Sequence, residues 1–353
     1  VEDVSTGAKK MENGQYDVTF GNGETAELDE LGKAMLHFKV TYFGKRINLD
    51  LFHAISDGTG AMEFLNIIVA EYLKIKYPNE FEDLNIHSGA SEDDLNQDSY
   101  KKFFKKMGIA ADNLKFAYHP MSLKLPYNQL QFFEVHMPVK PLLKHAKELS
   151  VSLTSYIAAS FMIAVQKDMP TRRIKIPVTV SMPVNLRNYY PSNTARNFFN
   201  NVNVTHIFSE DISLDELAVE FDARLRENLT EENIKKQMDN YETMEYVAPV
   251  RAVPLFVKQW VVRYGTKSSD RKVSLVLSNL GVQKPPEKMA EKVANYSAFC
   301  SSENLFSTMS SYKGELTLGI TSPYTSTAVI KNLVRAFTEE EIPVRVYATE
   351  VIR

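Results

Sequence analysis

Alternating hydrophobic and polar residues mark the first regular structure in the chain. The runs AMLHFKVTYF at 34–43 and INLDLFHAI at 47–55 predict two β-strands, and the GKR between them predicts a hairpin turn. Alternation places His53 on the same face of the second strand as the apolar residues Ile47, Leu49, Leu51 and Ile55. We therefore expect His53 on the buried side of this hairpin.

A change to helical spacing follows the hairpin. Hydrophobic residues recur every three or four positions after Thr59, a candidate N-cap, and Pro78 lies beyond the expected end of this helix. The next segment, 79–98, is acidic and has no Lys or Arg, which indicates an exposed connection.

The rest of the chain mixes both periodicities. Further strands are predicted at 128–138, 173–187, 197–209, 272–281, 296–302, 314–321 and 342–352. Further helices are predicted at 139–150, 152–168, 213–230, 231–247 and 326–341. Mixed elements over 353 residues indicate an α/β (α+β) protein of two lobes, which we place at 1–130 and 131–353.

Charge and composition narrow the function classes. A net charge of -3 gives no overall basic field for nucleic acid. The KKFFKK run at 101–106 is a candidate phosphate contact, but a solvated helix edge is the favoured interpretation. We find no apolar run of the roughly 20 residues that span a membrane. The single cysteine, Cys300, excludes an intrachain disulfide framework and fits a cytoplasmic protein.

Several familiar sites are not supported by the sequence. A metal site is not expected, because alternation places His37 on the polar face of its strand and away from His53. The GNGETA segment at 21–26 opens no apolar helix and is interpreted as a turn. No serine-hydrolase elbow is present, and Cys300 lacks the local signature of a nucleophile.

His53 has two interpretations. A buried neutral imidazole is a good general base near neutral pH, with Asp57 orienting the loop or receiving an arginine, and Gly58 allowing a sharp turn before the helix. A hydrogen-bonded core histidine explains the same spacing and is favoured when the spacing is considered alone.

Four short motifs add to this picture. HAISDG at 53–58, PVNLR at 183–187, RNFFN at 196–200 and SNLG at 278–281 occur in this order. Together they resemble the chloramphenicol acetyltransferase-like superfamily of coenzyme A-dependent acyltransferases, which includes plant BAHD enzymes and peptide-synthetase condensation domains. The resemblance is greatest to bacterial alcohol acetyltransferase-like proteins.

The resemblance implies a fold and a reaction. Two similar lobes would enclose a channel, with His53 as general base and no permanently bound cofactor. Acyl-coenzyme A would be the co-substrate, and its acyl group would pass directly to an alcohol or amine in a ternary complex.

The same resemblance assigns roles to the other motif residues. Asp57 would pair with Arg187 and hold the turn that carries His53, as structural support. Ser278 and Asn279 end a predicted strand before Gly281 and would provide oxyanion or substrate contacts, as would Asn197 and Asn200.

Departures from the family pattern keep alternatives open. Phe52 stands where condensation domains carry a second histidine, and the plant D-F-G-W-G segment is absent, since Trp260 lies in another context. The segment before His53 is short, so we expect that part of the first lobe is missing here. The alternatives are an acyl donor on an acyl carrier protein, and a non-catalytic ligand-binding protein of the same fold.

Overall fold

The computed structural model describes residues 9–10, 16–17, 38–86, 90–104, 114–126, 129–208, 212–245 and 264–349, with backbone alone at 9–10, 16–17 and 240–245. His37, the 21–26 turn, Lys105, Lys106 and Trp260 lie outside these ranges. Two compact units are present. The first contains Val1–Asp98, Ser192–Phe198 and Pro285–Lys292, and the second contains Ser99–Pro191, Phe199–Lys284 and Val293–Arg353. These units differ from the sequence-based lobes 1–130 and 131–353, which stay a prediction.

The first unit contains the predicted hairpin. Its strands are β3 (Phe38–Phe43) and β4 (Arg46–Leu51), joined by a two-residue turn in which Gly44 has a φ of +55°. Hairpin turns of this length need such left-handed residues, which glycine adopts without strain. Strands β1 (Lys9–Lys10) and β2 (Tyr16–Asp17) form a second antiparallel pair.

Helices complete the first unit. They are α1 (Gly58–Lys76), α2 (Pro78–Phe81), α3 (Glu92–Asn96) and α11 (Glu287–Lys292). Lys292 of α11 pairs with Glu80 at 2.9 Å and lies 4.8 Å from the centre of the Tyr77 ring. These contacts join a segment from late in the sequence to α2.

The second unit is built on a seven-stranded mixed sheet in the order β11-β5-β10-β9-β8-β6-β7. Pairing is antiparallel except between β6 and β8 and between β8 and β9. The strands are β5 (Gln131–Pro138), β6 (Val178–Asn185), β7 (Phe199–His206), β8 (Leu275–Val282), β9 (Leu305–Tyr312), β10 (Glu315–Ser322) and β11 (Arg345–Ala348). The mixed α/β fold class is therefore confirmed.

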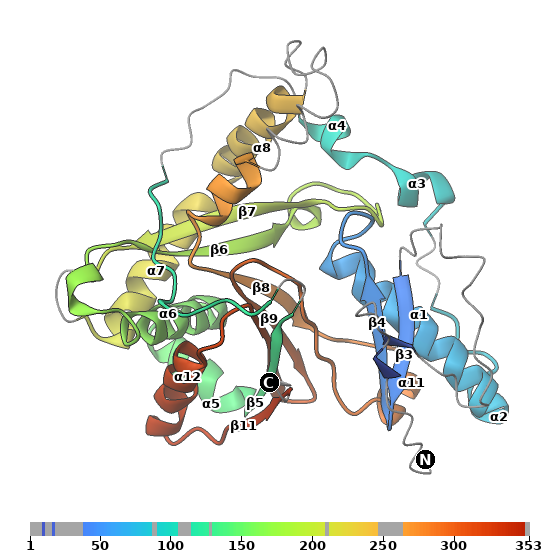
Figure 1. Ribbon diagram of the computed structural model, residues 1–353. Helices are drawn as coiled ribbons and strands as arrows, with labels where there is room; N and C mark the ends of the chain where they lie inside the picture. The colour runs from blue at the N-terminus through green and yellow to red at the C-terminus, as the bar shows by residue number, and fades with distance from the viewer. Residues whose placement is uncertain are drawn as a thin grey trace. The chain divides into compact units, whose positions relative to one another are not determined.

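Helices cover one face of this sheet (Figure 1). They are α5 (Val139–Glu148), α6 (Leu153–Gln166), α7 (Leu214–Asn228) and α12 (Ala328–Glu339). As its apolar sequence predicts, α6 is buried along its length and packs against α7 and α12. The unit also contains α4 (Ser99–Phe103), α8 (Glu231–Glu245) and the 3-10 turns η1 (Thr171–Arg173) and η2 (Leu186–Asn188).

An irregular strap, residues 293–302, crosses the polar face of the sheet. Its Tyr296 and Cys300 carbonyls accept hydrogen bonds from Ser310 (3.3 Å) and Thr321 (2.7 Å), and its Ala298 carbonyl accepts one from Thr308. The predicted strand at 296–302 is therefore wrong, because hydroxyl groups of the sheet use the carbonyls that a ladder would need. Strand β9 was not predicted from the sequence.

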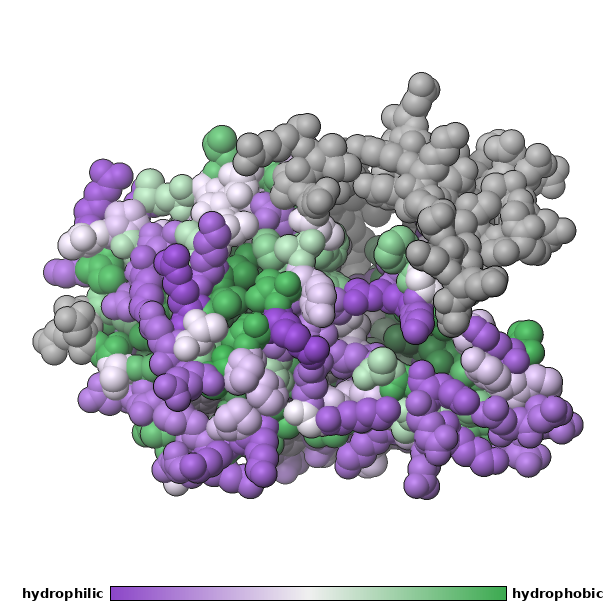
Figure 2. Space-filling model, turned by 90° about the horizontal axis from the view of Figure 1, so that it is seen from below, coloured by the Kyte–Doolittle hydropathy of each residue, from purple (hydrophilic) through white to green (hydrophobic). Residues whose placement is uncertain are grey.

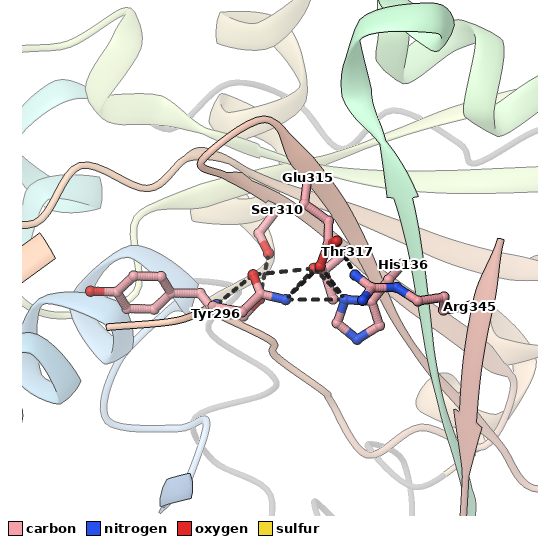
Figure 3. Close-up of polar contacts among 7 residues, drawn as sticks. His136, Tyr296, Ser310, Glu315, Thr317 and Arg345 are labelled. Carbon is pink, nitrogen blue, oxygen red and sulfur yellow. Dashed lines mark hydrogen bonds and ion pairs between the residues drawn. The ribbon is translucent and has the colours of Figure 1, made fainter. Parts of the chain in front are cut away.

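A polar cluster fixes one end of the strap and the edge strand β11 (Figure 3). His136 Nδ1 lies 2.8 Å from Glu315 Oε1, and Glu315 also pairs with Arg345. Asn295 of the strap donates to Thr317 at 3.0 Å. The cluster therefore links β5, β10, β11 and the strap.

The surface carries both hydrophilic and hydrophobic residues. The face in Figure 2 is mostly hydrophilic, with smaller groups of hydrophobic residues between the polar ones. Within the described ranges no single helix has the length and apolar character to cross a membrane, while α5 and α6 meet that test only as a pair bent by 93°.

Candidate functional site

His53 lies in a tight turn, and not in a strand. Strand β4 ends at Leu51, and the Ile55 N–H donates to the Phe52 carbonyl at 3.0 Å, which closes a turn over residues 52–55. The His53 side chain is exposed. The predicted burial on the apolar face of a strand is therefore wrong, because the chain leaves the β conformation two residues earlier. A sealed core histidine is also excluded.

Asp57 holds the end of this turn. Its side chain is 5% exposed, and Oδ1 accepts the Gly60 N–H at 3.1 Å, which makes Asp57 the N-cap of α1 in place of the expected Thr59. Oδ2 accepts the Phe198 N–H at 3.0 Å. Both carboxylate oxygens thus satisfy backbone donors, and one of those donors comes from a segment 141 residues later.

The segment 195–198 binds the turn at two more points. The Asn197 Nδ2 group donates to the carbonyls of His53 (2.8 Å) and Ala54 (3.2 Å). Ser56 Oγ donates to the Ala195 carbonyl at 2.7 Å. The structure therefore brings His53, Asp57 and Asn197 together within the first unit.

Glycine is required at position 60. A Cβ there would lie 2.1 Å from Ser56 Oγ and 2.9 Å from the Ala195 carbonyl. A sharp backbone turn was predicted at Gly58, but Gly58 is the first residue of α1 and has helical geometry. Ser56 and Gly60 were not predicted as site residues. The second glycine of the D-G-T-G sequence is the one signal in the sequence for a close approach of another segment to the backbone at Gly60.

Arg187 lies in η2, directly after β6, in the second unit. Its N–H donates to Asn185 Oδ1 at 3.0 Å, and its Nη1 donates to the same oxygen at 3.2 Å. The predicted ion pair with Asp57 would join the two units and stays a prediction.

The SNLG motif lies inside a strand. We expected the strand to end before Gly281, but β8 continues to Val282 through an irregularity between Asn279 and Gly281, where Gly281 has a φ of +71°. Asn279 Oδ1 accepts the Gly281 N–H at 2.8 Å, and its Nδ2 donates to Thr154 of α6 at 2.8 Å. The Gly281 N–H is thus already bonded within the motif. The roles of Ser278 and Asn279 toward a substrate stay predictions.

Asn200 is at the start of β7 in the second unit. It is 2% exposed, and its Nδ2 donates to Gln237 of α8 at 2.7 Å. Its amide therefore contributes to the contact between β7 and α8. A role in substrate binding stays a prediction.

The surroundings of two other potentially reactive side chains, Cys300 and His136, favour structural roles for both. Burial raises the pKa of the Cys300 thiol to about 11, which disfavours the thiolate that a nucleophile needs. His136 is buried beside Glu315, but this carboxylate also pairs with Arg345 of β11 (Figure 3). In the described residues no group of three His, Cys, Asp or Glu side chains could hold a metal ion.

Solved structures identify the fold. Polyketide synthase associated protein 5 from Mycobacterium tuberculosis superposes with a TM-score of 0.53 at 11% identity, over 93% of this chain and 84% of that one. F. sporotrichioides TRI101, complexed with coenzyme A and T-2, gives 0.54 at 13%, over 88% of this chain and 69% of that one. The chain shares the fold of these two structures.

A synthetase domain has this fold as well. The epimerization domain of the third module of tyrocidine synthetase B superposes with a TM-score of 0.50 at 13% identity, over 86% of this chain and 70% of that one. By sequence, no protein-family model and no curated protein matches the chain. The fold prediction is confirmed, and the similarity lies in the structure.

Proposed function

We propose that the protein is an acyltransferase that moves an acyl group, acetyl among the candidates, from a coenzyme A thioester to an alcohol or amine. The observation that carries this proposal is the His53 turn. An exposed imidazole lies in a turn whose backbone is held by Asp57, Ser56 and Asn197, in a chain with the acyltransferase fold.

The proposed reaction needs one base and no covalent enzyme intermediate. The His53 imidazole takes the proton from the acceptor hydroxyl or amine while the acceptor oxygen or nitrogen attacks the thioester carbonyl carbon. The tetrahedral intermediate then expels the thiolate of coenzyme A, which recovers the proton from the imidazolium. The raised pKa of Cys300 fits a mechanism without a cysteine nucleophile.

Rigidity of the turn supports the base role. A general base must stay within hydrogen-bond distance of the proton that it removes, and small displacements are costly. Two main-chain carbonyls of the turn, at His53 and Ala54, are bonded to Asn197, and the helix that follows is capped by Asp57. In this proposal Arg187, Ser278 and Asn279 keep the roles that the family resemblance assigns to them.

A His53→Ala substitution tests the base. We expect thioester cleavage to fall by about 10²- to 10⁴-fold, the usual contribution of a general base. His145→Ala is the matched control. His145 is a partly exposed histidine of the second unit and bonds Asp215 of the same unit. Free thiol release from acetyl-coenzyme A in the presence of an alcohol and amine panel gives the rate, and thermal unfolding checks that both variants fold. Wild-type turnover in His53→Ala would refute the assignment.

A second candidate changes the acyl donor to an acyl carrier protein. Its support is the similarity to a polyketide synthase associated protein and to a synthetase epimerization domain. Turnover with the same acyl group on coenzyme A and on a carrier protein separates the two donors. A large preference for the carrier would favour this candidate. Ligand binding without cleavage of either donor would identify a non-catalytic binding protein.

A further inference from the structure

Asn197 has one hydrogen-bonding group still to be satisfied. Its Nδ2 lies close to two carbonyl oxygens, those of His53 and Ala54, and only an NH₂ group can donate to both, which fixes the orientation of the amide. The other amide atom, Oδ1, is buried and has no hydrogen-bond partner. Asn197 therefore presents an acceptor, and not a donor, beside the His53 turn.

This arrangement limits what Asn197 can do in catalysis. An oxyanion needs donors, and the Asn197 amide hydrogens already bond the turn. A buried acceptor without a partner is costly, and native structures satisfy such atoms with water or a ligand. The group that satisfies Oδ1 must supply an N–H or O–H.

The reaction itself selects between these donors. An alcohol acceptor has a single hydroxyl hydrogen, and that hydrogen passes to His53. A primary amine keeps one further N–H, and the pantetheine arm of coenzyme A carries two amide N–H groups. An acceptor atom on the residue that bonds the backbone of the His53 turn therefore suits a substrate that has a further N–H.

We propose that Asn197 Oδ1 accepts a hydrogen bond from an N–H of a bound substrate, either an amine acceptor or the pantetheine amide of the acyl donor. This inference rests on the proposed acyl transfer at His53. Asn197 then has two functions in one side chain: Nδ2 positions the turn, and Oδ1 binds the substrate.

The experiment compares Asn197→Ala with Ser56→Ala. Ser56 Oγ joins the same two segments through the Ala195 carbonyl, so its loss loosens the turn without removing the Oδ1 acceptor. One arm measures the dissociation constant of coenzyme A by calorimetry. The other measures kcat and KM for the matched acceptors hexylamine and hexanol, and thermal unfolding is followed for every variant.

We expect Asn197→Ala to weaken one N–H partner selectively by about 3- to 10-fold, the range of one hydrogen bond. If the amine is the partner, kcat/KM falls more for hexylamine than for hexanol. If pantetheine is the partner, the coenzyme A dissociation constant rises. Ser56→Ala should change neither the hexylamine-to-hexanol ratio nor coenzyme A affinity by this amount.

Other outcomes overturn the proposal. Equal losses for both acceptors with unchanged coenzyme A affinity would mean that Asn197 only positions the turn. The same conclusion would follow if Asn197→Ala and Ser56→Ala changed coenzyme A affinity and the hexylamine-to-hexanol ratio of kcat/KM to the same extent. If the wild type cleaves no thioester, acyl transfer itself fails; unchanged coenzyme A affinity in Asn197→Ala would then refute this inference as well.

Discussion

Two buried aspartates, one in each unit, hold the start of a helix in different ways. Asp57 and Asp222 are each 5% exposed. Asp57 caps its own helix, α1, and accepts the Phe198 N–H from a distant segment. Asp222 lies on α7 and accepts the Ser152 N–H (2.9 Å) and the Ser155 hydroxyl (2.7 Å) at the start of α6.

The difference lies in what each carboxylate supports. The bonds of Asp222 join two helices over the sheet core and involve no candidate site residue. Those of Asp57 fix the ends of the turn that carries His53. Although Asp57 and Asp222 are equally buried and similarly bonded, we expect only the loss of Asp57 to lower activity. Substitutions at the two positions can therefore separate effects on stability from effects on function.

Asp57→Ala should have the largest combined effect. It removes the α1 N-cap and leaves the buried Phe198 N–H without this acceptor, which together cost about 2–4 kcal/mol in the free energy of unfolding. The His53 turn loses its fixed position, so we expect activity per folded molecule to fall roughly 100-fold. Urea unfolding and steady-state kinetics measure the two effects. Unchanged kcat in folded Asp57→Ala would contradict the positioning role.

Asp222→Ala should reduce stability by about 2–3 kcal/mol and leave activity per folded molecule unchanged. Burial alone would raise the Asp222 pKa, but the bonds from Ser152, Ser155 and Arg226 outweigh it and hold this pKa below its usual value. The stabilisation is thus fully present above the unfolded pKa of about 3.9 and is lost as pH falls through the folded pKa.

Acid unfolding tests whether the contribution of Asp222 to stability is lost as the pH falls. The stability difference between wild type and Asp222→Asn should shrink as the pH is lowered from about 5 to 2. A difference that grows over this range, or a kcat that falls with either Asp222 substitution, would remove the contrast with Asp57.

Gly60→Ala should give the smallest of the three losses of stability. The added Cβ meets Ser56 Oγ and the Ala195 carbonyl, and such overpacking costs about 1–3 kcal/mol. Displacement of the 195–198 segment should also lower activity by roughly tenfold. Gly265→Ala is the control, because its Cβ would have no neighbour within 4 Å. If the two alanine variants have equal stability and kinetics, the close packing at Gly60 is of no consequence.

The sequence predicted elements best where one face is apolar and the other is polar or solvated. The hairpin of β3 and β4 follows directly from this periodicity. Helix α6 was predicted in another way, from its nearly continuous apolar sequence, and it is buried along its length. Strand β9 was missed because both of its faces are covered: Leu305 and Met309 face the core while Thr308 and Ser310 bond the strap. Conversely, the predicted strand at 296–302 has no strand partner among the described residues.

The candidate site shows the same limit. The motif identified His53 and Asp57, since their spacing is local. The partners of Asp57 and Ser56 at 195–198 are invisible to periodicity, because only the folded chain brings them near. The error over His53 also has a local cause: alternation does not show that a strand has ended, and the Phe52–Ile55 turn lacks proline and glycine.

The return of residues 195–198 to the His53 turn has a consequence for biosynthesis. During translation the HAISDG motif emerges about 140 residues before its partners. Its early form therefore lacks the Asn197 amide group that donates to the His53 and Ala54 carbonyls, and the Phe198 N–H that donates to Asp57. These bonds to the turn can form only when residues 195–198 have been made. A fragment ending at residue 190 would therefore contain the complete motif and yet lack the parts that give the histidine a fixed position.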